Sequence, residues 1–311
     1  MRIAAILTPM SDHNLRLARQ VGVTDVVATY PGTNLDELLR LRDRIASFDL
    51  KLSVIERLLP HDQLVHNRSG RDEQLDAIKN LIHNMGHAGV AVLCYNWMPA
   101  DDWCRTDTDV LERGGARVTA FDIDAMTNKA EFTPTVTSAA DLWHNLEAFL
   151  REVIPVAEEA GVTLALHPDD PPMSPLGGQP QIMVSSEALE RAANLVKSPA
   201  NGICFCQGTL SSAGEHIPTA IHRLGPYIRF VHFRNVVGTV PRFRESFQDN
   251  GQIDMFAAMQ AYKEIGFDGP IRPDHVPTLD GETNENPGYE TLGRLYAVGY
   301  MWGLIQAAGI R

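Results

Sequence analysis

Eight short apolar segments alternate with longer segments of helical periodicity along this 311-residue chain. The apolar segments are rich in Val, Ile and Leu, which is typical of strands buried on both faces of a parallel sheet. They are RIAAIL (2–7), TDVVAT (24–29), KLSVIE (51–56), GVAVLCY (89–95), VTLALH (162–167), NGICFC (201–206), YIRFVHF (227–233) and GPIRPDH (269–275). The helical patterns lie near 13–20, 35–48, 71–87, 138–160, 186–197, 215–224, 253–265 and 289–308. Repeated strand–helix pairs predict an α/β fold around a parallel sheet.

Three polar residues support the predicted helix starts. Asn34 precedes LDELLRL, Ser138 precedes AADLWHNL, and Ser185 precedes SEALERAANL. The side-chain oxygens of Asn and Ser at such positions accept hydrogen bonds from amides in the first helical turn. We therefore expect helices to begin directly after these residues.

Eight strand–helix pairs in one continuous chain predict a single (β/α)8 TIM barrel that takes up residues 1–311. A doubly wound open sheet is the alternative, but it would carry a Gly-rich phosphate turn after the first strand, and none follows Leu7. One long irregular stretch, at about 96–137, contains GG and TPT and follows the fourth strand. We expect it to form a lid or a substrate wall over the mouth of the barrel, with a surface insertion as the alternative.

Charge and composition exclude several classes of protein. The chain has 39 acidic and 27 basic residues, a formal net charge of −12, and such a surface repels nucleic-acid phosphates and anionic membranes. No apolar run approaches the roughly 18 residues of a membrane span, and the first residues lack the features of a signal peptide. Four cysteines are too few for a disulfide scaffold. We expect a cytoplasmic protein with reduced thiols.

The last four predicted strands end in side chains of types that bind metals. His167 ends the fifth strand, Cys206 the sixth, His232 lies at the end of the seventh, and Asp274 lies at the end of the eighth. Each alone is explained by ordinary packing, but active sites of barrels assemble at these strand ends. Two imidazoles, a thiolate and a carboxylate would converge on one cation. Cys204 lies two residues before Cys206, nearer the barrel floor, and is expected to pack in the interior.

Two arginines flank the predicted ligands and indicate an anionic substrate. Arg234 follows His232 by two residues, and Arg272 precedes Asp274 by two residues. Guanidinium groups bind carboxylates with paired hydrogen bonds, and two of them beside a cation would favour an anion. The alternative is that one arginine forms a buried ion pair with an acid such as Glu56, at the end of the third strand.

Four further residues near the predicted ligands are candidates for proton transfer or for positioning. His275 follows Asp274, and its ordinary pKa near neutrality suits a general acid or base; Tyr289 is a second candidate. In HPDDPP (167–172), Asp169 and Asp170 either orient His167 or act as turn acids.

Six segments with these residues resemble the barrel-type mannonate dehydratases. They are CYNWMPADDWCRTD (94–107), LHPDDPP (166–172), SPANGICFCQGTL (198–210), YIRFVHFRNV (227–236), GFDGPIRPDHVP (266–277) and GYETLGRLYAVGYMWGLI (288–305). The similarity covers about residue 75 to the C-terminus. It implies a TIM barrel of the xylose-isomerase-like superfamily that removes water from D-mannonate to give 2-keto-3-deoxy-D-gluconate, with Mn²⁺ or Fe²⁺.

The resemblance also implies roles for individual residues. It makes His167, Cys206, His232 and Asp274 the metal ligands, and His275 and Tyr289 the catalytic acid–base pair. It implies that Arg105, Asn96, Arg234 and Arg272 contact the substrate. The thiolate and imidazoles would also suit Zn²⁺, and Co²⁺ is a further candidate; the preference for Mn²⁺ or Fe²⁺ follows from the resemblance. Barrels of this kind often form dimers or tetramers, so a homo-oligomer is expected.

Four positions depart from the family pattern, and all concern the substrate rim. The family opens with Arg-Trp-Tyr-Gly on its first strand, where this chain has LTPMSD (7–12). Gln181 replaces an arginine, Gln248 replaces a histidine, and ERLLP (56–60) stands where the family has a segment like ESVP. The predicted metal ligands and the acid–base pair are retained, so the chemistry is better supported than the particular aldonate.

The resulting hypothesis is metal-assisted β-elimination of water from a sugar acid through an enediolate. One of His275 and Tyr289 would remove the C2 proton, and the other would protonate the departing C3 hydroxyl. Two alternatives stay open: a metal-dependent sugar isomerase or epimerase on the same barrel, and a barrel that binds sugar acids without turnover. Isomerase relatives usually bind metal through Glu, Asp, His and Glu, and the retained acid–base pair argues against a mere binding protein.

Overall fold

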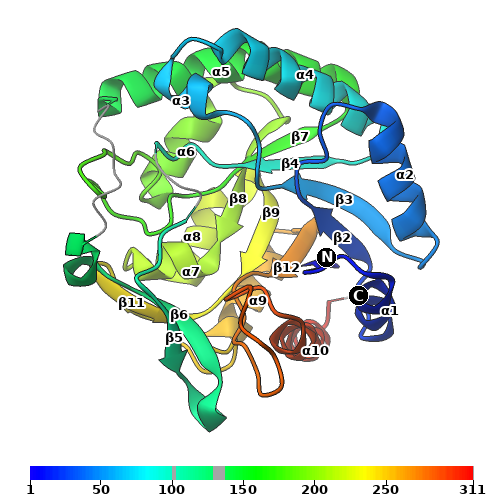
Figure 1. Ribbon diagram of the computed structural model, residues 1–311, viewed down its shortest axis with the longest axis vertical. Coiled ribbons are helices and arrows are strands. Elements are labelled where there is room, and N and C mark those ends of the chain that lie inside the picture. The colour runs from blue at the N-terminus through cyan, green and yellow to red at the C-terminus, as the bar shows by residue number, and fades with distance from the viewer. Residues whose placement is uncertain (100–102, 129–136, 311) are drawn as a thin grey trace.

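The computed structural model describes residues 1–99, 103–128 and 137–310, and it contains a closed barrel of eight parallel strands. Around the barrel, the order of strands is β1-β12-β9-β8-β7-β4-β3-β2 (Figure 1). Their bounds are β1 Arg2–Ile6, β2 Asp25–Ala28, β3 Lys51–Glu56, β4 Val92–Tyr95, β7 Thr163–Leu166, β8 Asn201–Cys206, β9 Ile228–Phe233 and β12 Pro270–Pro273. Each coincides with one of the eight segments expected from the sequence, so the prediction of a TIM barrel is confirmed.

Helices cover the outside of the barrel, and the expected helix is present after every strand. They are α1 Asp12–Gln20, α2 Leu35–Ala46, α4 Arg71–Ala88, α5 Ala139–Ala160, α6 Ser186–Leu195, α8 Ile217–Leu224, α9 Met255–Glu264 and α10 Thr291–Ala307. The side chains of Asn34, Ser138 and Ser185 accept hydrogen bonds from amides in the first turns of α2, α5 and α6, as predicted. Two short helices, α3 Asp62–His66 and α7 Gln207–Ser212, were not expected.

Apolar side chains fill two separate layers because each strand is buried on both faces. One layer lies between the sheet and the helices and contains residues such as Leu15, Ile78, Leu146 and Ile221. The other contains residues such as Val27, Val54 and Phe230, which alternate along the strands with residues of the first layer such as Val26, Ile55 and Val231. This second layer fills the barrel interior beneath the carboxyl ends of the strands, where the functional side chains gather.

A second sheet lies outside the barrel, and the sequence did not indicate it. Its order is β10-β11-β6-β5, and all of its pairs are antiparallel (Figure 1). β5 (Asp107–Leu111) and β6 (Arg117–Asp122) come from the stretch at 96–137 that was expected to be irregular, whereas β10 (Val236–Thr239) and β11 (Arg242–Glu245) follow β9. The expectation of an irregular stretch was therefore wrong for residues 107–122. The TPT at 133–135 lies outside the described residues.

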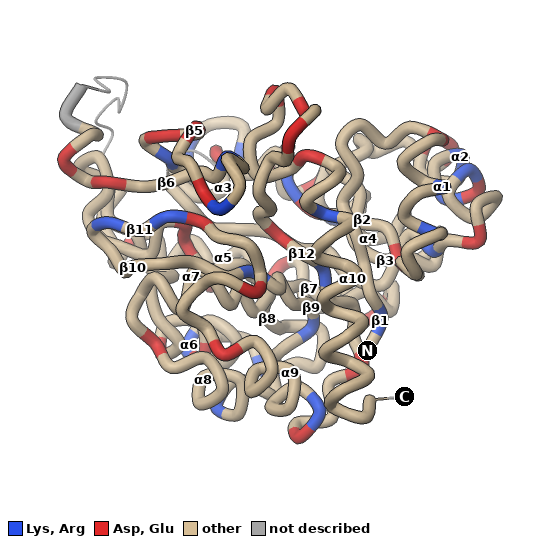
Figure 2. Tube along the Cα trace, turned by 90° about the horizontal axis from the view of Figure 1, so that it is seen from below, with Lys and Arg blue, Asp and Glu red and all other residues tan. Residues whose placement is uncertain are grey.

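The two ends of the barrel differ in what covers them. Figure 2 shows β5, β6 and α3 toward one end of the molecule and α8 and α9 toward the other, with acidic and basic residues interspersed along the trace. The second sheet follows the carboxyl ends of β4 and β9, so it lies beside the mouth of the barrel, as a wall would. Within the described part of the chain, no helix combines the length and the apolar character needed to cross a bilayer.

The second sheet has a small apolar core of its own, and this core yields a first prediction. Phe121 and Phe243 pair across β6 and β11 with ring centroids 5.9 Å apart, and Phe121 is 1% exposed. Phe121→Ala should destabilise the sheet by about 3–5 kcal/mol, because it removes a buried aromatic ring. Leu111→Ala, at a residue of β5 that is 72% exposed, is the control and should change stability by about 0.5 kcal/mol or less. Amide hydrogen exchange of β6 and β11 measures both; equal exchange rates in the two variants would contradict the prediction.

Candidate functional site

The four predicted metal ligands lie together at the carboxyl ends of adjacent barrel strands. His167 directly follows β7, Cys206 is the last residue of β8, His232 lies in β9, and Asp274 directly follows β12. Cys206 and His232 are paired across β8 and β9 in the register of the sheet. This convergence is a consequence of the parallel barrel, which brings the ends of all its strands to one rim.

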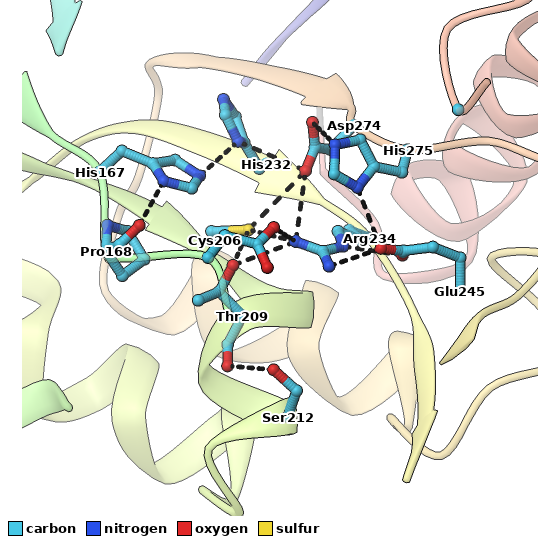
Figure 3. Close-up of polar contacts among 12 residues, drawn as sticks. His167, Pro168, Cys206, Thr209, Ser212, His232, Arg234, Glu245, Asp274 and His275 are labelled. Carbon is cyan, nitrogen blue, oxygen red and sulfur yellow. Dashed lines mark hydrogen bonds and ion pairs between the residues drawn. The ribbon is translucent and has the colours of Figure 1, made fainter. Parts of the chain in front are cut away.

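Short distances connect the four side chains (Figure 3). Nε2 of His167 is 3.1 Å from Nδ1 of His232, which is 3.7 Å from Oδ2 of Asp274. The same carboxylate oxygen is 3.8 Å from Sγ of Cys206. The ligand atoms of His167, Cys206 and His232 thus lie within 4.8 Å of one another, and the carboxylate of Asp274 adjoins two of them. Imidazole, thiolate and carboxylate are ligands that divalent transition metals accept, so the donor set fits such an ion.

Contacts around the cluster fix the orientation of its members. Nδ1 of His167 is 2.6 Å from the carbonyl oxygen of Pro168, so its Nε2 points at His232. The hydroxyl of Thr209 donates to Sγ of Cys206 at 3.1 Å. Burial would raise the pKa of Asp274, but the neighbouring His275 and Arg272 hold it well below its ordinary range. Asp274 is therefore a carboxylate, as a ligand must be.

Asp169 and Asp170, for which the sequence left two interpretations open, have separate partners. Oδ2 of Asp169 accepts a hydrogen bond from the amide of Met183, and burial raises the pKa of Asp169 to about 7. Asp170 forms ion pairs with Arg105 and Arg234. Nδ1 of His167 instead contacts the backbone carbonyl of Pro168, so a main-chain oxygen orients its ring.

Arg105 and Arg234 belong to a buried ionic cluster with Asp170 and Glu245. Arg105 donates to Asp170 at 2.9 and 3.0 Å and to Glu245 at 2.7 Å. Arg234 donates to Glu245 at 2.6 and 2.8 Å and to Asp170 at 2.7 Å. Burial alone would raise the pKa of Glu245, yet Arg234, His275 and Arg105 bring it down to about 2. The two guanidinium groups thus hold the wall of the site together.

Gly208 makes room for this cluster. A Cβ at position 208 would lie 2.6 Å from both Cγ and Cδ of Arg234, closer than packed carbon atoms allow. Only glycine leaves the space through which the arginine side chain reaches Asp170 and Glu245.

Arg272 forms the buried ion pair that the sequence offered as the alternative to substrate binding. Its Nε and Nη2 donate to Glu56 at 3.0 and 2.7 Å, and its Nη1 is 3.0 Å from Asp274. Glu56 also lies 3.1 Å from Nε2 of His232. Arg272 therefore links the end of β3 to the ligand cluster from inside the barrel.

His275 and Tyr289 meet beside the ligand cluster. Nε2 of His275 is 3.2 Å from the hydroxyl of Tyr289, and its Nδ1 is 3.0 Å from Oε1 of Glu245. Burial lowers the pKa of His275 and raises that of Tyr289, so both side chains are neutral near neutral pH. The ring of Trp103 lies over His275, with centroids 4.9 Å apart.

A cavity of about 230 Å³ opens onto these residues. Its lining includes His167, His232, Asp274, His275 and Tyr289 together with Asn96, whose side-chain oxygen accepts from the amide of Met98. The lining also includes Asp170 and Arg272. The guanidinium of Arg105 lies behind this lining and forms an ion pair with Asp170. The site residues predicted from the sequence thus either line this one cavity or contact residues that line it.

Sequence reasoning missed several residues of the site. Arg57 and Trp103 line the cavity, and the guanidinium of Arg57 lies 4.7 Å from the centroid of the Tyr289 ring. Glu245 supports His275 from β11. Arg57 directly follows the end of β3, so its place at a strand end was a usable signal. Glu245 gave no such signal, since β11 belongs to the unexpected sheet.

The two glutamines at positions that depart from the family pattern are both buried. Nε2 of Gln248 donates to the backbone carbonyl of His275 at 3.1 Å, so it supports the loop that carries the proposed acid–base residue. The backbone amide of Gln181 donates to the hydroxyl of Ser174 at 2.9 Å, within the loop after β7.

A closed barrel that carries a histidine–tyrosine contact and a cluster of ligand-type side chains at the carboxyl ends of its strands is typical of TIM-barrel enzymes. The sequence model of the family "D-mannonate dehydratase (UxuA)" matches residues 9–139 and 131–310. The chain therefore belongs to the D-mannonate dehydratase family, whose members are hydro-lyases. The match also reaches further toward the N-terminus than the motifs found in the sequence, which began near residue 75.

Individual relatives agree with the family assignment. The chain is 34% identical to the mannonate dehydratase of Oceanobacillus iheyensis, with 87% of this chain and 85% of that protein aligned. It is 33% identical to the mannonate dehydratase of Streptococcus equi subsp. zooepidemicus, with coverages of 88% and 83%. The crystal structure of the mannonate dehydratase from Streptococcus suis serotype 2 superposes with a TM-score of 0.91 at 31% identity, over 99% of this chain and 96% of that one. An L-ribulose 3-epimerase, at 14% identity and a TM-score of 0.66, shares the fold.

The buried pair of Arg272 and Glu56 yields a second prediction. Arg272→Met should lower the free energy of unfolding by about 3–5 kcal/mol, because it leaves the carboxylate of Glu56 buried without its partner. Adding Glu56→Gln should recover part of the loss. The control is Arg42→Met, which removes an exposed pair with Asp43 and should cost about 1 kcal/mol or less. Urea denaturation measures all three; unchanged stability together with weaker substrate binding would show that Arg272 serves the substrate instead.

Proposed function

We propose that this protein dehydrates D-mannonate to 2-keto-3-deoxy-D-gluconate and water, with a divalent cation as cofactor. Family membership supports the reaction type. The observation that carries the proposal is the contact between Nε2 of His275 and the hydroxyl of Tyr289, 3.2 Å apart, at the edge of the ligand cluster. An elimination requires one group to take a proton and another to give one, and these two groups face the same cavity.

His167, Cys206, His232 and Asp274 would hold the cation. Their mixed nitrogen, sulfur and oxygen donors suit Mn²⁺ or Fe²⁺, which the family resemblance favours, and Zn²⁺ or Co²⁺ also fit. When bound, the cation would attract the carboxylate and C2 hydroxyl of the substrate and stabilise the negative charge that develops there.

The contacts of His275 indicate which proton it moves. Glu245 is ionised and can only accept, so Nδ1 of His275 carries a hydrogen and donates it. The lone pair then lies on Nε2, toward Tyr289 and the cavity. We therefore assign His275 as the base that takes the C2 proton. Tyr289 keeps its hydroxyl proton because burial raises its pKa, and it is the acid that protonates the C3 hydroxyl as it leaves.

The electron pairs follow from these assignments. The pair of the C2–H bond moves toward the carboxylate as His275 accepts the proton. It then forms the C2–C3 double bond while the C3–O bond breaks, and the hydroxide departs as water with the proton of Tyr289. The resulting enol takes a proton at C3 and releases the proton of its C2 hydroxyl, which gives the 2-keto acid. Transfer of the proton from His275 back to Tyr289 restores both groups. Each positioned proton transfer contributes roughly 10²–10⁴-fold to the rate.

Three neighbouring side chains would shape the substrate pocket around this pair. Trp103 covers one face of His275 and keeps bulk water from it. Arg57 brings a positive charge to the cavity beside Tyr289, which favours an anionic substrate. Asn96 lies in the lining on the side of β4 and presents a polar group suited to a sugar hydroxyl.

An assay of dehydration tests the proposed function. Protein stripped of metal and reconstituted with Mn²⁺ should convert D-mannonate to a 2-keto-3-deoxy acid, and fewer or none of the other aldonates in a panel. His275→Gln should lower kcat by roughly 10²–10⁴-fold. His83→Gln, at an exposed histidine of α4, should leave it unchanged. Isomerised or epimerised sugars from a sugar panel, with no 2-keto-3-deoxy acid from any aldonate, would favour the isomerase alternative.

Exchange of the C2 hydrogen separates the roles of the two proposed proton carriers. In D₂O, Tyr289→Phe should still exchange the C2 hydrogen of D-mannonate for deuterium, because His275 remains, while dehydration falls. His275→Gln should lose both exchange and dehydration. Nuclear magnetic resonance of recovered substrate measures the exchange. The opposite pattern, with exchange kept in His275→Gln and lost in Tyr289→Phe, would reverse the assignment.

A further inference from the structure

Two cysteines lie in the barrel interior directly beside the predicted ligand cluster, and the proposed function uses neither. Cys94 is on β4 and Cys204 is on β8, and they are 1% and 0% exposed. Their sulfur atoms and a ring nitrogen of His232 all lie within 4.8 Å of one another. The sequence spacing of the cysteines gave no sign of this, because β4 and β8 are brought together only by the closed barrel.

Cys94, Cys204 and His232 differ in chemical character from the residues that surround them in the barrel interior. The same interior layer otherwise consists largely of apolar side chains, among them Ile6, Val54 and Phe230. The thiols therefore face each other and His232 within an apolar lining. Cys94 also lines the cavity, so an ion that enters the cavity can reach the pair.

We propose that Cys94, Cys204 and His232 form a second cation site, selective for soft metals such as Zn²⁺ or Cd²⁺. Two thiolates and an imidazole are the donors that such ions prefer, whereas Mn²⁺ prefers oxygen. Two thiolates on one tetrahedral zinc ion are about 3.8 Å apart, since each Zn–S bond is about 2.3 Å. The observed grouping, with all three ligand atoms within 4.8 Å of one another, is compatible with that spacing. On binding, the two thiols release their protons to solvent and the sulfurs donate to the cation.

His232 connects this second site to the first. Its Nδ1 faces His167 and Asp274 (Figure 3), whereas its Nε2 lies on the opposite side of the ring. This Nε2 is 3.1 Å from Glu56. The carboxylate of Glu56 is thus placed to supply a fourth ligand. A soft cation bound here draws on the same imidazole as the catalytic cation, so it inhibits the enzyme. Binding is independent of the proposed function, whereas the inhibition rests on it.

Cadmium binding to the reduced full-length protein tests the site, because thiolate ligation of Cd²⁺ gives a charge-transfer band in the ultraviolet. The Cys206→Ser background removes the thiolate of the first site. In that background the band should persist, and it should be lost on adding either Cys94→Ala or Cys204→Ala. Adding Cys104→Ala, at a partly buried cysteine outside both sites, should leave the band intact. Circular dichroism checks that each variant is folded.

The outcomes separate the second site from the proposed function. Absence of the band in Cys206→Ser, or a full band in both folded alanine variants, overturns the site. With Mn²⁺-loaded protein, Cd²⁺ should inhibit dehydration of D-mannonate less in Cys204→Ala than in the Cys104→Ala control. Failure of dehydration in every variant, with the band behaving as expected, counts against the proposed function and leaves the cation site supported.

Discussion

The buried ionic cluster of Arg105, Arg234, Asp170 and Glu245 is the interaction on which the rest of the site depends. Its members come from the segment before β5, from β11, and from the loops after β9 and β7. Glu245 also contacts His275, so the cluster connects the second sheet to the proposed base. Buried charges are costly without partners, and here each one has at least two. The second sheet is therefore held in one place relative to the barrel rim.

The buried ionic cluster explains how the second sheet would affect the proposed proton transfer by His275. In the proposed mechanism, Glu245 accepts the hydrogen on Nδ1 of His275, and Glu245 is kept ionised by Arg234 and Arg105. In that mechanism, a shift of β11 would remove the contact that favours this tautomer, in which the lone pair of His275 lies on Nε2. A wall beside the barrel mouth would thus set the tautomer of the proposed base, which belongs to the barrel itself.

The fold could be predicted because its signal is local. Each barrel strand is a short apolar run between turn signals, and each helix repeats its buried face within a few residues. The ligand cluster could be predicted because parallel strands place their ends together, so His167, Cys206 and His232 needed only their strand assignments. The second sheet pairs Phe121 with Phe243, far apart in sequence, and its strands have weak alternation. The sequences of β6 and β11 do not indicate that these two strands pair.

The partners of the arginines could not be predicted for a related reason. A sequence shows that a guanidinium is near a site, but its partner is chosen by packing between distant segments. Arg105 and Arg234 balance Asp170 and Glu245, and Arg272 balances Glu56. In the proposed site, the charges left at the rim would be those of Asp274 and of Cys206 as a thiolate ligand. The proposed divalent cation would neutralise these two charges. The positive charge that Arg57 brings to the cavity then favours an anionic substrate, in spite of the net charge of −12.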